Sequence, residues 1–156
     1  MASEATIRDR SAIDWALLVA RGLVGVIFMA HGAQKLLGAF GGPGLSAVVQ
    51  MMGPLGYLVT VGEFFGGAGL VFGFLSRFSA ASIIIIMLGA VATVHGKFGF
   101  FMNWAGNQAG EGFEYHLLAI AALLPIVVAG PGRFAVGRLL PLPEGPGKET
   151  FAAALE

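Results

Sequence analysis

Six ionisable residues occur at corresponding positions of successive apolar segments in this 156-residue chain. The group includes every histidine of the protein and comprises His31, Lys35, Glu63, His95, Glu114 and His116. Imidazole with carboxylate is the usual ligand set for Zn, Fe, Mn or Cu(II) where thiolates are absent. The same side chains beside apolar walls would hold the carbonyl oxygens of a quinone and move its protons. These residue types therefore point to two kinds of ligand, a metal ion or a quinone.

The composition indicates an integral membrane protein. Apolar residues make up 56% of the chain and charged residues only 12%, about half the charged share of a soluble domain. This balance excludes a soluble enzyme and a disordered chain. Nine basic and nine acidic residues leave no net charge, which excludes a nucleic-acid-binding protein. The chain has no cysteine, so a disulfide scaffold and thiol chemistry are also excluded.

The apolar stretches predict an all-α fold, a bundle of four transmembrane helices. The predicted spans are residues 13–37, 55–75, 78–94 and 115–129. We expect one membrane domain at residues 13–140, after a polar N-terminal segment (1–12) and before a flexible C-terminal tail (141–156). Residues 38–54 are expected to contain a short interfacial or re-entrant helix. The aromatic segment 96–112 is expected to lie on the membrane surface.

The distribution of positive charge predicts the orientation of the spans. With four spans, one side carries Arg8, Arg10, Arg77, Arg133, Arg138 and Lys148, and the other side carries Lys35 and Lys97. We therefore expect a multi-pass protein of the cytoplasmic (inner) membrane with both termini in the cytoplasm. In this orientation the six ionisable residues fall at one depth near the extracytoplasmic surface. We call these six residues the polar layer.

One further charged residue, Arg21, lies in the first span about 15 Å deeper than His31. An arginine in mid-span needs a counter-ion or several carbonyl groups. Glu63 is the acid well inside a span, so we predict an Arg21–Glu63 pair, which would serve equally as a structural tie between the first two spans. Glu114 and His116 are about 200° apart around a helix, so only one of them can face the bundle interior.

Several segments resemble the DoxX family of small four-helix membrane proteins. They are Arg21–Leu36, Gly62–Gly67, Gly73–Arg77, Ala92–His95 and Glu114–His116, within a resemblance that extends from about Ala20 to Leu140. The resemblance implies a four-helix membrane fold. The family takes its name from a membrane subunit similar to those of thiosulfate:quinone oxidoreductases. Relatives are associated with membrane redox and sulfur-stress complexes, so a redox role for this chain follows by analogy.

The leading hypothesis from the sequence is a subunit of a membrane redox system that binds a quinone-like molecule. His31 and Lys35 would hydrogen-bond the headgroup, Glu63 and His95 would relay protons, and Arg21 would hold Glu63. Glu114 and His116 are further candidates for ligand binding, and a metal ion would use His31, His95 and His116. Electrons would come from a redox partner protein, because the chain has no cysteine, haem motif or flavin motif. The alternatives are a non-catalytic membrane scaffold or assembly subunit, a small transporter, and a homo-oligomer in place of a separate partner.

Overall fold

The computed structural model describes residues 4–139, and the side chains of residues 9–139. The five α-helices are α1 (Glu4–Leu37), α2 (Gly44–Met52), α3 (Leu55–Phe72), α4 (Ser76–Ala90) and α5 (Glu114–Ala129). Four shorter turns are η1 (Ala39–Gly41), the π-helix η2 (Val91–His95), η3 (Gly96–Phe98) and η4 (Val136–Leu139). No β-strand occurs within residues 4–139. The prediction of an all-α fold is confirmed.

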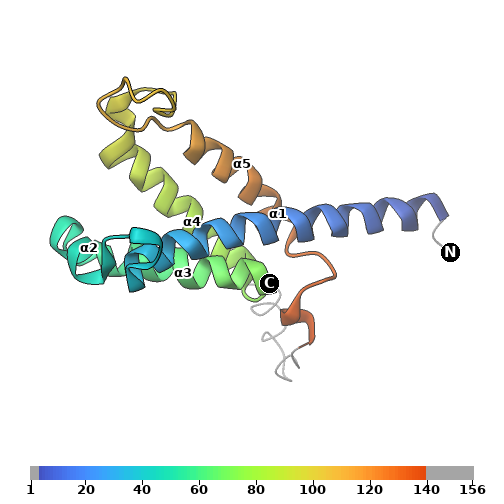
Figure 1. Ribbon diagram of the computed structural model, residues 1–156. Helices are drawn as coiled ribbons and strands as arrows, with labels where there is room; N and C mark the ends of the chain where they lie inside the picture. The colour runs from blue at the N-terminus through green and yellow to red at the C-terminus, as the bar shows by residue number, and fades with distance from the viewer. Residues whose placement is uncertain (1–3, 140–156) are drawn as a thin grey trace.

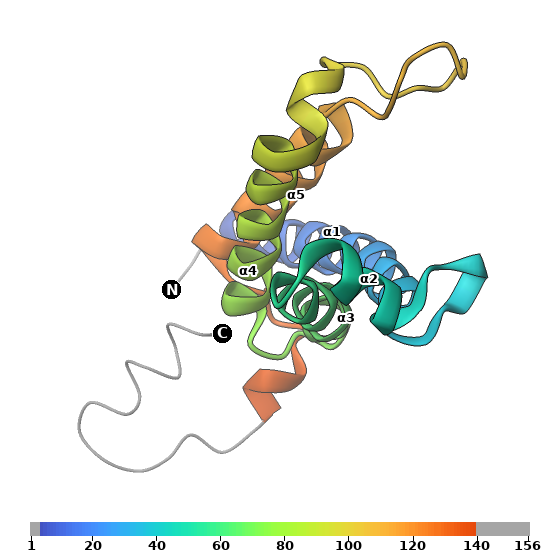
Figure 2. The same ribbon diagram turned by 90° about the vertical axis from the view of Figure 1, so that its left-hand side faces the viewer.

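Three helical stretches of the described chain are long and apolar enough to cross a bilayer. They are Asp9–Leu37, Leu55–Phe72 and Ser76–Phe98. The fourth apolar helix, α5, has 16 residues, which gives a length of about 24 Å against a hydrocarbon core of about 30 Å. Figures 1 and 2 both show α5 beside α4 and running back along it. The predicted four-helix membrane bundle is therefore confirmed, and α5 is shorter than each of the three spanning stretches.

The first helix begins earlier than the apolar pattern indicated. We expected residues 1–12 to form a separate polar segment, whereas α1 is continuous from Glu4. No glycine or proline interrupts residues 4–21, so nothing in this stretch opposes a helix. Asp14 connects the first part of α1 to the segment after α5. Its Oδ1 accepts a hydrogen bond of 2.9 Å from the Arg133 backbone N–H. The predicted tail at residues 141–156 lies outside the described residues.

The helices form two antiparallel pairs. α1 and α3 lie side by side, and the α4–α5 pair diverges from them toward the connecting loop (Figures 1 and 2). α2 follows the first span, so the short helix predicted there is confirmed. Figure 1 shows α2 and the loop between η3 and α5 at one end of the molecule, away from the beginning of α1 and from η4.

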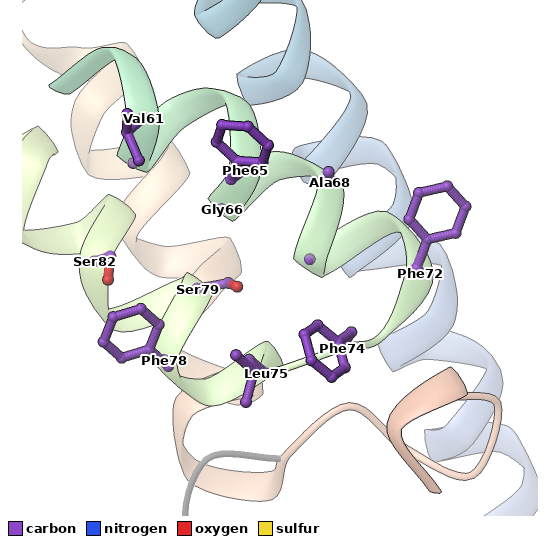
Figure 3. Close-up of a pocket in the computed structure, with 12 residues that line it drawn as sticks. Val61, Phe65, Gly66, Ala68, Phe72, Phe74, Leu75, Phe78, Ser79 and Ser82 are labelled. Atoms are coloured by element: carbon purple, nitrogen blue, oxygen red, sulfur yellow. The ribbon is translucent and has the colours of Figure 1, made fainter. Parts of the chain in front are cut away.

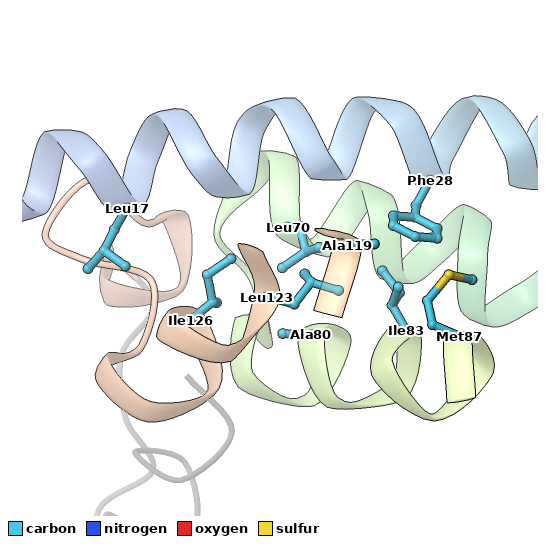
Figure 4. Close-up of a cluster of buried hydrophobic side chains, with 9 residues drawn as sticks. All are labelled: Leu17, Phe28, Leu70, Ala80, Ile83, Met87, Ala119, Leu123 and Ile126. Atoms are coloured by element: carbon cyan, nitrogen blue, oxygen red, sulfur yellow. The ribbon is translucent and has the colours of Figure 1, made fainter. Parts of the chain in front are cut away.

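Close packing between α1 and α3 depends on glycine. A Cβ atom at Gly25 would lie 2.7 Å from the Gly67 carbonyl oxygen, and one at Gly32 would overlap the Phe64 backbone. Small residues let transmembrane helices approach closely enough for dispersion and weak hydrogen bonds to hold them together. Figure 4 shows the buried cluster that all four long helices share, which comprises Leu17, Phe28, Leu70, Ala80, Ile83, Met87, Ala119, Leu123 and Ile126.

The loop between η3 and α5 is folded back on itself like a hairpin. Its two ends are joined by backbone hydrogen bonds from Phe113 N–H to Gly99 O (3.2 Å) and from Glu114 N–H to Phe100 O (2.8 Å). Phe101 and Trp104 are 67% and 87% exposed. Exposed aromatic rings of this kind are typical of the membrane–water interface. The loop therefore exposes aromatic rings, and its location on the membrane surface stays a prediction.

Candidate functional site

An ion pair joins α1 to α3 within the polar layer. Lys35 Nζ lies 2.5 Å from Glu63 Oε2. The Glu63 side chain is 6% exposed and the Lys35 side chain 24% exposed, so both charges are largely removed from solvent. Each therefore serves as the counter-ion of the other inside the bundle.

Arg21 has a different environment from the one predicted. Its side chain is buried and, among the described residues, donates hydrogen bonds to backbone carbonyl oxygens only. Nη1 donates to Leu70 O (2.7 Å) and Val71 O (2.8 Å), Nε donates to Pro131 O (3.2 Å), and Nη2 donates to Phe134 O. The first two carbonyls belong to the last turn of α3, where carbonyl groups have no amide partner further along the same helix. Arg21 thus joins α1 to the end of α3 and to the segment after α5.

The predicted Arg21–Glu63 pair is therefore wrong. Arg21 and Lys35 are 14 residues apart in α1, which corresponds to about 21 Å along the helix. α3 runs antiparallel to α1, so its last turn meets Arg21 while Glu63, further back, meets Lys35. Because four carbonyl groups already satisfy the guanidinium, Arg21 needs no carboxylate.

Aromatic contacts connect α1 to the start of α5. The Tyr115 ring centroid lies 6.3 Å from that of His31 and 6.5 Å from that of Phe28, and the His31 and Phe28 centroids are 6.5 Å apart. His31 is exposed, Tyr115 is half-buried and Phe28 is buried. The three rings therefore extend from the surface of the bundle into its core.

The other two histidines lie close to each other, and one of them, His116, contacts Tyr115. The ring centroids of His95 and His116 are 4.3 Å apart, and the Tyr115 and His116 centroids are 5.8 Å apart. His95 belongs to the π-helix η2, a wider turn that changes the direction of the side chains after it and is frequent at functional sites. His95 Nδ1 is 2.8 Å from the carbonyl oxygen of Glu111 in the loop. We call His31, Tyr115, His116 and His95 the ring row.

Glu114 and His116 at the start of α5 face different ways, as their spacing requires. His116 is 5% exposed and lies inside the bundle. Glu114 faces the loop, where its Oε1 accepts hydrogen bonds from Met102 N–H (2.9 Å) and Trp104 Nε1 (3.2 Å). Glu114 thus stabilises the loop, and the arrangement does not bring it to the ring row.

The candidate metal ligands do not form a metal-binding group. The Tyr115 ring contacts those of both His31 and His116. Within residues 4–139, no three His, Cys, Asp or Glu side chains are placed to hold a metal ion. A transition-metal site in a protein usually takes three or four such ligands at 2.0–2.3 Å. The arrangement of His31, His95 and His116 does not fit that requirement.

Tyr115 is the residue of this site that sequence reasoning missed. Two features single it out in the structure. Its hydroxyl is buried and has no hydrogen-bond partner in the described chain, and its ring contacts those of both His31 and His116. The available signal was its position between Glu114 and His116 at the start of an otherwise apolar helix.

A separate apolar cavity of about 350 Å³ lies between α3 and α4 (Figure 3). None of the polar-layer residues lines it, and its polar side chains are those of Ser79 and Ser82. Val61 and Phe65 line the cavity, and each is about 200° around α3 from Glu63. The cavity and the polar layer therefore occupy different faces of α3.

Comparison with known proteins agrees with this architecture. The family model described as DoxX matches residues 16–96, which include Arg21, His31, Lys35, Glu63 and His95. The chain is 32% identical over 130 residues to the inner membrane protein YqjF of Escherichia coli (strain K12), covering 81% of this chain and 93% of that relative. No solved structure matches the chain. The apolar helices and this relative support an inner-membrane location. The chain belongs to the DoxX family.

Proposed function

We propose that this protein is a subunit of a membrane redox system and binds a quinone-like molecule at the ring row. The observation that supports this most directly is the continuity of the row. It begins at the exposed His31, passes the buried Tyr115 hydroxyl, and ends at the closely spaced His116 and His95. A lipid-dissolved molecule would enter sideways from the bilayer at His31.

The chemistry of these side chains suits a quinone headgroup. Planar rings pack against aromatic side chains in offset or edge-to-face geometry, and the quinone carbonyls accept hydrogen bonds from imidazole and phenol groups. Reduction of a quinone to a quinol consumes two electrons and two protons. His116 and His95 would carry protons between the headgroup and the loop, where Glu111 contacts His95. Because the chain has no cysteine, we assign the supply of electrons to a partner protein.

The ion pair modifies the roles first expected for two residues. Lys35 was expected to bind the headgroup, but its ammonium contacts Glu63. We propose that Lys35 orients the Glu63 carboxylate, and that Glu63 acts as a proton acceptor of the site. Arg21, at the other end of α3, has no part in this site and is a structural residue.

A second candidate function is a non-catalytic scaffold or assembly subunit. It is favoured by one observation, namely that the most deeply placed charges already have partners within the protein. Lys35 and Glu63 contact each other, and Arg21 is bonded to four carbonyl groups. On this proposal the polar layer only locks the helices together, and no small molecule binds there.

Thermal unfolding with added quinone distinguishes the two candidates. The detergent-purified protein is titrated with decylubiquinone and with a short-chain menaquinone, and bound metals are quantified in the same sample. A ligand that binds only the folded state adds about 2.7 kcal/mol at 100 times its Kd, which is a readily measured shift. We expect the shift in wild type and in a Lys97→Ala control, and its loss in His31→Ala. No shift in wild type with either quinone would favour the scaffold.

A further inference from the structure

We propose that Tyr115 determines the ligand class of the ring row by donating a hydrogen bond to a neutral, carbonyl-bearing molecule, to the exclusion of anions. This inference rests on the proposed function and adds a selecting residue to it. Its starting point is the Tyr115 hydroxyl, which is buried and has no hydrogen-bond partner among the described residues. More than nine-tenths of buried polar groups in proteins do have such a partner, so the phenol is a donor available to a ligand.

The surroundings of the phenol indicate what that partner is. Phe28, His31 and His116 have their ring centroids 5.8–6.5 Å from that of Tyr115. Such walls favour a planar, largely apolar molecule. A tyrosine hydroxyl that has no acceptor can donate a hydrogen bond to a carbonyl oxygen. A planar ring with a carbonyl group satisfies both requirements.

The charges near the site disfavour an anion. Lys35 is neutralised by Glu63 at 2.5 Å, so its ammonium is already engaged. An anion at the phenol would therefore find no free positive charge on Lys35. Transfer of an unpaired anion from water into a site of low dielectric constant costs far more than transfer of a neutral molecule. A neutral ligand avoids that cost entirely.

His116 contributes a second polar group on the same side of the row. Its Nδ1 makes no hydrogen bond of normal geometry with the described residues, although the Phe113 carbonyl is nearby. Whichever ring nitrogen carries the proton, a neutral imidazole offers one donor and one acceptor. It can therefore hydrogen-bond to a neutral ligand held by Tyr115. A neutral imidazole does not supply the full positive charge that would stabilise an anion.

The test compares Tyr115→Phe with wild type and with Tyr57→Phe. Removing the Tyr115 hydroxyl leaves no protein group unpaired, so we expect the variant to fold as wild type does. Tyr57 is 53% exposed on α3 and lies outside the ring row, which makes it a matched control for loss of a phenol. The probes are decylubiquinone, an alkylated dimethoxytoluene that lacks its carbonyl groups, and sodium thiosulfate as the anion.

We expect decylubiquinone to bind wild type and Tyr57→Phe equally and Tyr115→Phe about tenfold more weakly, the effect of losing one buried hydrogen bond. The preference for the quinone over its carbonyl-free analogue should disappear in Tyr115→Phe, which a purely structural role would not cause. Equal quinone affinity in Tyr115→Phe and wild type would overturn this inference and leave the proposed function intact. Thiosulfate binding as tight as that of the quinone would also overturn it. Absence of quinone binding in wild type would overturn both.

Discussion

Lys35 Nζ and Glu63 Oε2 are 2.5 Å apart, and this ion pair ties the end of α1 to the middle of α3. We predict that Glu63→Gln lowers the free energy of unfolding by about 2 kcal/mol. That is less than the 3–5 kcal/mol typical of a fully buried pair, since Lys35 is 24% exposed and its long stem can reach the interface. Chemical unfolding in detergent measures the change.

The matched control for this prediction removes both charges together. Lys35→Met combined with Glu63→Leu leaves no unpaired charge, and apolar replacements of buried ion pairs are often neutral or stabilising. We expect this double variant to be more stable than Glu63→Gln. A Glu63→Gln protein as stable as wild type would show that the pair contributes nothing to the bundle.

Arg21 should be essential to stability and independent of Glu63. Arg21→Met removes hydrogen bonds to four carbonyl groups, of which Leu70 O keeps a bond of 3.3 Å from Gly73 N–H, and we expect a loss of about 3 kcal/mol or more. Arg21→Lys should fall between wild type and Arg21→Met, because an ammonium offers three donors from one nitrogen in place of a five-donor fork. Arg10→Met, an exposed change in the same helix, should stay within about 0.5 kcal/mol of wild type.

A double-mutant cycle separates the observed partners from the predicted ones. Glu63→Gln and Arg21→Met should be additive within about 0.5 kcal/mol, since the two side chains share no partner. Glu63→Gln and Lys35→Met should instead be coupled by 1 kcal/mol or more. Strong coupling between Arg21 and Glu63 would contradict the assignment of Arg21 to the carbonyl groups.

The contrast between Arg21 and the histidines shows what a single sequence can predict. Apart from the start of α1, the apolar stretches bounded the long helices closely, and α5 begins one residue before the expected start at Tyr115. Depth along each span followed from those boundaries, which is why His95 and His116 were expected at the same depth. The partner of a charged residue additionally depends on the register and rotation of neighbouring helices. Arg21 binds backbone carbonyl groups. Every residue has one, so the pattern of side chains does not indicate which of them it binds.

Tyr115 illustrates a second limit of the sequence. A tyrosine at the start of an apolar helix is typical of the membrane interface, so its identity alone gave no reason to place it in a site. What distinguishes it is burial of its hydroxyl without a partner among the described residues, which only three-dimensional packing reveals. The start of α1 illustrates the opposite case, because local helix-forming tendency extends the helix back to Glu4 through polar residues.

Glycine substitutions should separate the glycines that pack α1 against α3 from one that does not. A Cβ atom at Gly32 would overlap the Phe64 backbone, whereas one at Gly22 would meet nothing within 4 Å. We expect Gly32→Ala to lower stability by about 1–3 kcal/mol through overpacking. Gly22→Ala should be neutral or stabilising by up to about 1 kcal/mol, since alanine favours the helix. Equal thermal midpoints for the two variants would mean that α1 and α3 are not closely packed.

The orientation of the protein is open to a direct labelling test, because the chain has no cysteine of its own. Single cysteines at Asn107→Cys in the loop and Arg10→Cys in α1 replace exposed residues. The excess of basic residues on the side of Arg10 predicts that this side is cytoplasmic. A membrane-impermeant maleimide should therefore label Asn107→Cys in intact cells, and Arg10→Cys only after the membrane is permeabilised. The reverse pattern would place the ring row on the cytoplasmic side, and a quinone bound there would exchange its protons with the cytoplasm.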